Sequence, residues 1–205
     1  MAELSNIRSQ PYFGLIAVAI IAAACVAIGY LIASRRIKQP ILVFMGRFSV
    51  TFALLFVIEA AVLIATPSVH ATMQNLTARL VGGVLTLGGA SHSISGSTII
   101  LQNPSFSFDV TAACLGGELF WTYIALIVAE TTASTRQRIV GIIAGLAILI
   151  LFNFFRITLS VYLEWLTGYH VHDYFYLFNM IFVLLIWAVW LWRLKPRRVT
   201  YPRAA

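Results

Sequence analysis

The stretch FDVTAACLGGE, residues 108–118, decides how this chain of 205 residues is organised. It ends a run of alternating apolar residues, contains Cys114, one of two cysteines, and opens a long hydrophobic helix. A thiol at the N-terminus of a helix meets the positive end of the helix dipole, which favours the nucleophilic thiolate. A lone cysteine, however, is more often a small buried residue than a nucleophile. The positions of the other rare polar residues must therefore decide between these two roles.

The composition is that of an integral membrane protein. Hydrophobic residues fill 60% of the positions, charged residues only 10%, and the mean hydropathy is +0.91. A soluble domain of this size does not need so much apolar surface. The formal charge of +7 comes from short basic clusters beside apolar runs, which is typical of membrane-topology signals. No basic patch interleaved with aromatic residues occurs in a soluble segment, so we expect no nucleic-acid partner.

The apolar runs predict an all-α integral membrane protein with about five transmembrane helices in a single domain, residues 1–205. The predicted spans are residues 12–33, 48–66, 111–130, 139–161 and 172–192. The polar region 67–110 separates the second span from the third. It begins with helical spacing of apolar residues, typical of an amphipathic segment lying on the membrane. It continues with short strands, because residues alternate on both sides of Ser95-Gly96 and again at Phe106, Phe108 and Val110. The turn at Ser95-Gly96 predicts a short β-hairpin before the third span.

The basic residues predict the orientation of the chain in a plasma membrane. Eleven of the 14 Lys and Arg residues follow the first span, follow the third span, or lie in the C-terminal tail. The positive-inside rule makes these segments cytoplasmic, which places the N-terminus outside and the C-terminus inside. All four histidines, His70, His92, His170 and His172, then fall in outward-facing segments. We therefore expect the chemistry on the external face.

Polar residues inside the predicted spans form a constellation at one depth. A charge at the centre of a span costs roughly 2.5–3.5 kcal/mol on insertion scales, so such residues are functional candidates. Three polar stripes have helical spacing: Asn153, Arg156 and Ser160; Cys114, Glu118 and Thr122; His172, Tyr176 and Asn179. Glu59 and Glu118 are the acids whose charge can compensate the positive charge of Arg156. Glu59 is favoured as the residue that pairs with it. The structural alternatives are that Arg156 snorkels outward, that His172 marks the interface, and that Glu59 is only a structural partner.

A thiol, an imidazole and a guanidinium at one depth suit acyl transfer. Metal binding fits less well, because neither Cys-x-x-Cys nor His-x-x-x-His occurs. The glycine pairs have no partner lysine, so no phosphate-binding loop is predicted, and we expect neither a metal nor a cofactor. The helical spacing that leads back from Asn179 reaches His172, which favours His172 over His170 as the acid/base. His170 stays as the alternative.

Three short motifs together resemble the exosortase/archaeosortase family. They are Cys114-x-Gly116 opening a span, Asn153-x-x-Arg156 near the end of the next, and a histidine at the start of the last. The resemblance covers roughly residues 48–192. Family members often have a hydroxyl residue, a glycine and an aliphatic residue after the cysteine, whereas this chain has Leu115-Gly116-Gly117.

The resemblance implies a membrane cysteine protease or transpeptidase. Such an enzyme cleaves a C-terminal sorting signal of exported proteins, made of a motif, an apolar span and a basic tail, and transfers the protein to a surface acceptor such as a lipid or glycan. It implies that Cys114 is the nucleophile, His172 the acid/base and Arg156 the residue that binds the substrate or transition state. Asn153, Glu59 and Glu118 would support them.

Two other functions are weighed against this one. The first is a non-enzymatic membrane assembly factor or small-solute carrier, which would use Arg156 and Glu59 as an intramembrane charge pair. The second is quinone-linked thiol oxidation, which is disfavoured because only Cys114 lies on the predicted outer side, and a redox pair needs two thiols. Exported substrate proteins and membrane lipids are the expected partners of the enzyme.

Overall fold

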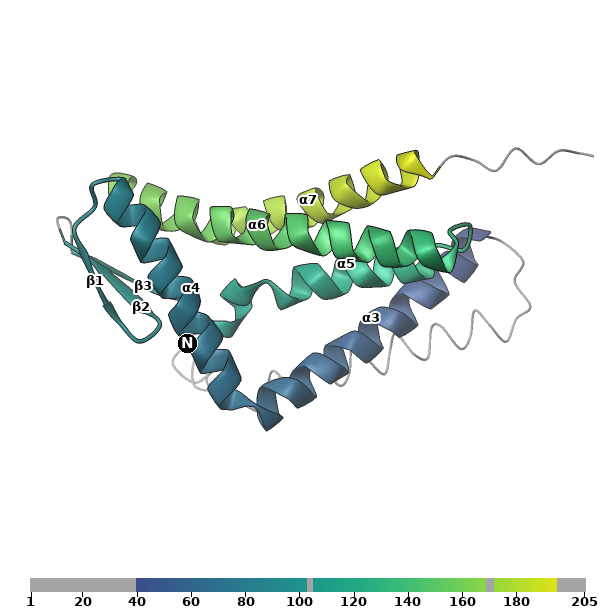
Figure 1. The fold of residues 1–205 in the computed structure, drawn as a ribbon, viewed down its shortest axis with the longest axis horizontal. Helices are drawn as coiled ribbons and strands as arrows, with labels where there is room; N and C mark the ends of the chain where they lie inside the picture. Colours follow the sequence, from purple (N-terminus) through teal and green to yellow (C-terminus); the bar gives the residue numbers. More distant parts are fainter. Residues whose placement is uncertain (1–39, 103–104, 169–171, 195–205) are drawn as a thin grey trace, which may run out of the picture.

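The computed structural model describes residues 40–102, 105–168 and 172–194, and these residues are mostly helical (Figure 1). The predicted span 12–33 lies outside the described residues. The elements in chain order are α3 (Pro40–Ala65), α4 (Pro67–Leu87), β1 (His92–Ser95), β2 (Thr98–Leu101), β3 (Phe106–Asp109), the 3₁₀ helix η1 (Ala112–Leu115), α5 (Gly117–Ala129), α6 (Thr135–Thr167) and α7 (His172–Arg193).

Two of the described helices, α3 and α6, are long and apolar enough to cross a membrane. Helix α7 begins and ends close to the predicted last span, but its apolar part is shorter. Helix α5 has only 13 residues, whereas a span needs about 20. It is shorter than predicted because the chain from Ala112 to Leu115 forms a 3₁₀ turn, and Gly116 then takes a left-handed conformation. The prediction of five spans is therefore not confirmed.

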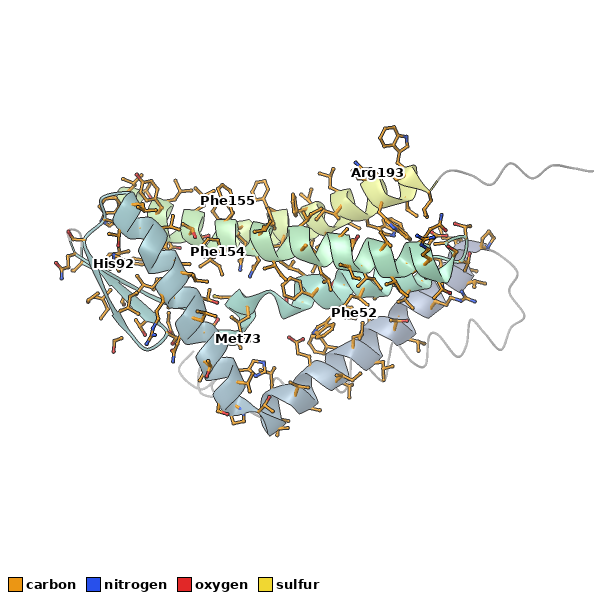
Figure 2. All side chains as sticks on the ribbon, viewed as in Figure 1. Phe52, Met73, His92, Phe154, Phe155 and Arg193 are labelled. Atoms are coloured by element: carbon orange, nitrogen blue, oxygen red, sulfur yellow. The ribbon has the colours of Figure 1, made fainter. Side chains whose placement is uncertain are left out.

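The outer surface of the long helices is apolar. Phe155 of α6 is 60% exposed and points away from the bundle, whereas the adjacent Phe154 packs against the interior (Figure 2). Large exposed apolar side chains also follow α3 from Ile41 to Ile64. A soluble protein rarely exposes so much contiguous apolar surface, because water disfavours it. This surface matches a lipid environment.

The polar region after α3 forms a helix and a small sheet. Pro67 occupies the first turn of α4, where a missing backbone N–H costs little. The buried face of α4 consists of Ala78, Val81, Gly82 and Leu85, at helical spacing. The predicted hairpin is present, with Gly96 at positive φ in its two-residue turn. The alternating residues from Phe106 form β3, which pairs with β2 and extends the hairpin to an antiparallel sheet of three strands in the order β1-β2-β3.

Helix α6 connects two hydrophobic cores. Its 33 residues span about 50 Å, more than the roughly 30 Å of a bilayer's hydrocarbon core. The first core lies among α5, α6 and α7 and includes Tyr123, Leu149 and Val183. The second lies where α4 and the sheet cover the C-terminal half of α6, around Ile157 and Val161. Helix α5 packs between α3 and α6, and the turn that precedes it enters the second core (Figure 1).

Candidate active site

Cys114 lies in the 3₁₀ turn η1, just before the first turn of α5. The side chain is 3% exposed and belongs to the core beneath α4 and the sheet. The Oγ1 atom of Thr111 lies 3.5 Å from the Cys114 Sγ atom. A thiolate can only accept a hydrogen bond, so in that state the Thr111 hydroxyl is the donor. Thr111 was not among the predicted site residues, although its i, i+3 spacing from the cysteine was the available signal.

Asn153 connects the cysteine turn to Arg156. Its Nδ2 atom donates to the backbone carbonyl of Cys114 at 2.8 Å. Its Oδ1 atom accepts from Nε and Nη2 of Arg156, at 3.2 and 3.1 Å. All three residues are buried, and hydrogen bonds that involve a charged donor are strong in a buried site. The structure therefore holds the cysteine turn and the guanidinium in one fixed arrangement through a single amide.

Gly116 permits this arrangement. Its φ of 81° is in the left-handed region, which disfavours side chains other than hydrogen. A Cβ atom on Gly116 would also lie 2.9 Å from Cγ of Asn153. Glycine is thus required here both by conformation and by the close approach of the Asn153 amide. The Cys114-x-Gly116 motif has a physical basis in this contact.

Arg156 faces a small pocket of about 10 Å³, close to the minimum volume for one water molecule. The guanidinium is 2% exposed, so it does not snorkel to the surface. Glu118 from α5 and Asn179 from α7 line the same pocket, and Asn179 is 4% exposed. Residues from all three predicted polar stripes therefore meet at this point.

Glu59 lies elsewhere, which corrects the expected pairing with Arg156. It lines a cavity of about 430 Å³ together with His70 of α4 and Trp121 of α5, and Arg156 is not among the residues that line this cavity. Glu118 lies between the two and lines both this cavity and the pocket of Arg156. The Glu59 carboxylate lies so close to Gly117 that a Cβ atom there would collide with it. The physical reason is the position of α5, which lies between α3 and α6 (Figure 1). Glu118 is the acid that shares a pocket with Arg156.

The two candidate acid/base residues are only partly placed. His170 lies outside the described residues, and so does the side chain of His172. The backbone of α7 begins at His172, so position 172 lies seven residues before Asn179. Seven residues are close to two helical turns, which puts the two positions on the same face of α7. The prediction that His172 serves the site is untested.

The polar stripe on α6 is longer than the predicted stripe of Asn153, Arg156 and Ser160. Ser160 is fully buried, and Glu164, at 3% exposure, continues the same face toward the end of the helix. The sequence signal for Glu164 was the spacing of eight residues from Arg156, but it was assigned to a loop. Among the residues that the structure describes, no three His, Cys, Asp or Glu side chains gather closely enough to hold a metal ion.

Comparison with known proteins assigns the chain to a family. Residues 2–193 match the family model described as transmembrane exosortase. No curated protein and no solved structure matches. The matched region includes the cysteine turn, the Asn153–Arg156 network and α7. This protein therefore belongs to the transmembrane exosortase family and is a membrane protein.

Proposed function

We propose that this protein is a cysteine-dependent protease/transpeptidase that cleaves a C-terminal sorting signal of exported proteins and transfers them to a surface acceptor. Membership of the transmembrane exosortase family supports a transpeptidase-like role. The single observation that carries the assignment of residues is Asn153, which binds both the Cys114 carbonyl and the Arg156 guanidinium. A structural cysteine would not need its backbone tied to a buried cation.

In the proposed first step, the Cys114 sulfur attacks the carbonyl carbon of the scissile peptide bond. The thiol proton passes to the imidazole of His172, and the leaving amine takes it as the carbon–nitrogen bond breaks. The product is a thioester on Cys114. An acceptor amine, hydroxyl or water then attacks the thioester and gives its proton to the imidazole. The carbon–sulfur bond breaks, and the thiolate recovers the proton.

Arg156 is proposed to stabilise the negative oxygen that develops in both steps. Electrostatic stabilisation works best when the cation is fixed before the reaction, because no reorganisation is then needed. Asn153 holds two of the Arg156 nitrogens, and burial excludes most of the water that would screen the charge. The neighbouring Glu118 limits the cost of burying this cation.

The test is processing of a reporter by the full chain in membranes. The reporter is an exported protein that ends in a native sorting signal from a neighbouring reading frame. Wild type should release the signal and form a thioester that mass spectrometry detects on Cys114. Cys114→Ala should abolish both while leaving abundance near normal. The other cysteine, Cys25, falls within the predicted first span, so Cys25→Ala is the matched control and should keep full activity. Normal processing by Cys114→Ala, or equal loss in both variants, contradicts the proposed nucleophile.

The external location of the site is part of the proposal. The distribution of basic residues predicts that reporter fusions after Lys38, Arg138 and Lys195 are cytoplasmic. Fusions at Ser95 and Thr167 should be external. A cytoplasmic signal from the Ser95 fusion would contradict the proposed external location, because Ser95 lies in the sheet that covers the Cys114 core.

The carrier or assembly-factor alternative loses its main support. It depended on an intramembrane pair between Arg156 and Glu59, and these residues line different pockets. A thiol-reactive probe distinguishes a cysteine-dependent enzyme from a non-enzymatic membrane protein. An activated Cys114 should react quickly at neutral pH once the probe reaches it, whereas an inert core thiol should not.

A further inference from the structure

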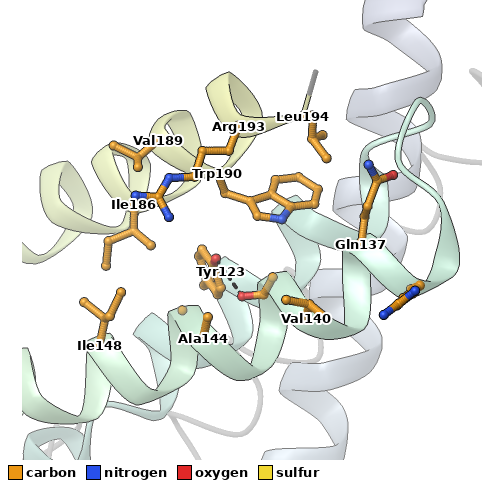
Figure 3. A pocket seen from close by; sticks show the side chains of 13 residues that line it. Tyr123, Gln137, Val140, Ala144, Ile148, Ile186, Val189, Trp190, Arg193 and Leu194 are labelled. Carbon is orange, nitrogen blue, oxygen red and sulfur yellow. Dashed lines mark hydrogen bonds between the residues drawn. The ribbon is translucent and has the colours of Figure 1, made fainter. Parts of the chain in front are cut away.

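A second cavity lies at the other end of the bundle, between the first half of α6 and the last turns of α7. Its volume is about 510 Å³, within the range typical of small-molecule sites. Ile186, Val189, Trp190 and Arg193 of α7 face Val140, Ala144 and Ile148 of α6 across an open space (Figure 3). Gln137 and Asn153 are sixteen residues apart on α6, about 24 Å along the axis, so this cavity is distant from the site.

The interior of the cavity is apolar and open to the outside of the bundle. Val140, Ile148 and Val189 are large apolar residues that are exposed in the structure. The floor is rigid, because the Tyr123 hydroxyl donates to the backbone carbonyl of Gly141 at 3.0 Å and is buried there. Gly145 admits the Tyr123 ring, with which a Cβ atom would collide. This is the chemistry of a groove for a hydrocarbon chain.

Two basic residues line the cavity. Arg136 lies in the first turn of α6 and Arg193 in the last turn of α7, and both line the cavity. None of the lining residues is acidic. The positive end of the α6 dipole adds to the potential of these arginines. Trp190 lies beside them, and tryptophan is the side chain enriched at headgroup level in membranes. Two cations in the lining of an apolar groove complement the anionic headgroup of a lipid whose acyl chain fills the groove.

We propose that this groove is a specific binding site for one anionic phospholipid of the membrane. Arg136 and Arg193 contact the phosphate, and an acyl chain lies along Ala144 and Ile148. With the orientation that the basic residues predict, the lipid belongs to the cytoplasmic leaflet. The site is independent of the proposed cleavage reaction, because it shares no residue with the Cys114 network. The bound lipid would join α6 to α7 at the end of the bundle opposite the site.

The experiment is native mass spectrometry of the delipidated full chain in detergent. Phosphatidylglycerol and phosphatidylcholine with identical acyl chains are added at equal concentration. Wild type should retain one phosphatidylglycerol, with affinity at least about tenfold above that for phosphatidylcholine. The double variant Arg136→Gln/Arg193→Gln should lose this preference, by roughly tenfold or more in affinity for phosphatidylglycerol. The matched control, Arg197→Gln/Arg198→Gln, removes the same charge from the C-terminal sequence and should keep the preference.

A second pair of variants tests the groove without changing any charge. Ala144→Phe fills the cavity and should prevent retention of phosphatidylglycerol, because Ala144 lines the groove and is exposed. Ala147→Phe adds the same ring at another exposed position of α6 that does not line the groove, and should retain the lipid. Equal retention of the two lipids by wild type would overturn the proposal. So would unchanged phosphatidylglycerol binding in the double arginine variant, or no binding by wild type.

Discussion

Two pairs of glycines lie at opposite ends of the described bundle, and they make room for different neighbours. An added Cβ atom would collide at Gly116 with the Asn153 amide, at Gly117 with the Glu59 carboxylate, at Gly141 with the Trp190 indole, and at Gly145 with the Tyr123 ring. The first pair therefore brings the backbone against hydrogen-bonding groups. The second brings a helix against aromatic rings, as small residues commonly do in membrane helices.

Glycine makes room for hydrogen-bonding groups at one end of the bundle and for aromatic rings at the other. The close neighbours of Gly116 and Gly117 are the polar side chains of Asn153 and Glu59, and Asn153 is the residue that holds both the cysteine turn and Arg156. The close neighbours of Gly141 and Gly145 are the aromatic rings of Trp190 and Tyr123, and their loss would cost packing energy. Changes at the first end should therefore affect activity per folded molecule, whereas changes at the second should mainly affect stability.

Among the substitutions near the cysteine turn that are discussed below, the largest loss of activity is expected when His172 is replaced. Removing a general acid/base typically lowers a rate by 10²- to 10⁴-fold. His172→Ala should therefore abolish thioester formation on Cys114 within detection. The reason is positional, because residue 172 lies two helical turns from Asn179, which lines the Arg156 pocket. The measurement is the amount of thioester trapped on the full chain with the reporter substrate.

His170→Ala is the matched control for that experiment. It removes the same side chain two residues earlier, where helical spacing would turn the position by about 200°. Most of the thioester should remain. An essential His170 together with a dispensable His172 would show that α7 does not present its Asn179 face to the cysteine in the way we propose.

An intermediate effect is expected for the glycines themselves. Gly116→Ala forces a side chain into the left-handed region, at a cost of about 1–3 kcal/mol, and pushes the Asn153 amide away from Cys114. Displacement of an aligned group by about 1 Å can cost roughly 100-fold in rate. We expect a loss of about this size in processing per folded molecule.

Gly145→Ala provides the contrast at the other end. The added methyl meets the buried Tyr123 ring, and overpacking of this kind costs about 1–3 kcal/mol. It should lower the melting temperature in detergent by a few degrees, with processing per folded molecule near wild type. If both variants lose stability equally and neither loses specific activity, the functional distinction between the two ends fails.

The sequence predicted the strands and helices of the fold better than it predicted which helices are long enough to cross a membrane. Alternation around Ser95-Gly96 located two strands, because a period of two is a strong signal for paired strands. Alternation at Phe106, Phe108 and Val110 indicated the third strand as well, but the sequence did not show that this strand pairs with β2. Helix α5 is shorter than the predicted third span because composition cannot show that Gly116 adopts a positive φ and interrupts the helix.

The sequence also predicted that Asn153, Arg156 and Glu118 would approach the cysteine turn, since helical spacing fixes which positions share a face. It could not predict which acid lies near Arg156. Glu59 and Glu118 had similar predicted depth, and the choice depends on α5 lying between α3 and α6, which is a matter of packing order. Thr111 and Glu164 were missed because each lies at the edge of an element, where boundaries are least certain.

The smallest effect is expected for Glu59→Gln, and it tests the order of the helices. The substitution keeps the size of the side chain beside Gly117 and removes only its charge. Glu59 is no longer expected to pair with Arg156, so processing should fall by no more than about fivefold, less than 1 kcal/mol.

The decisive measurement is a pair of double-mutant cycles with Arg156→Lys, read as melting temperature and processing. Glu118→Gln should couple to Arg156→Lys, because these residues line one pocket. Glu59→Gln should be additive with Arg156→Lys within about 0.5 kcal/mol. Strong coupling for Glu59 and none for Glu118 would mean that α3, rather than α5, supplies the acid that compensates the buried cation.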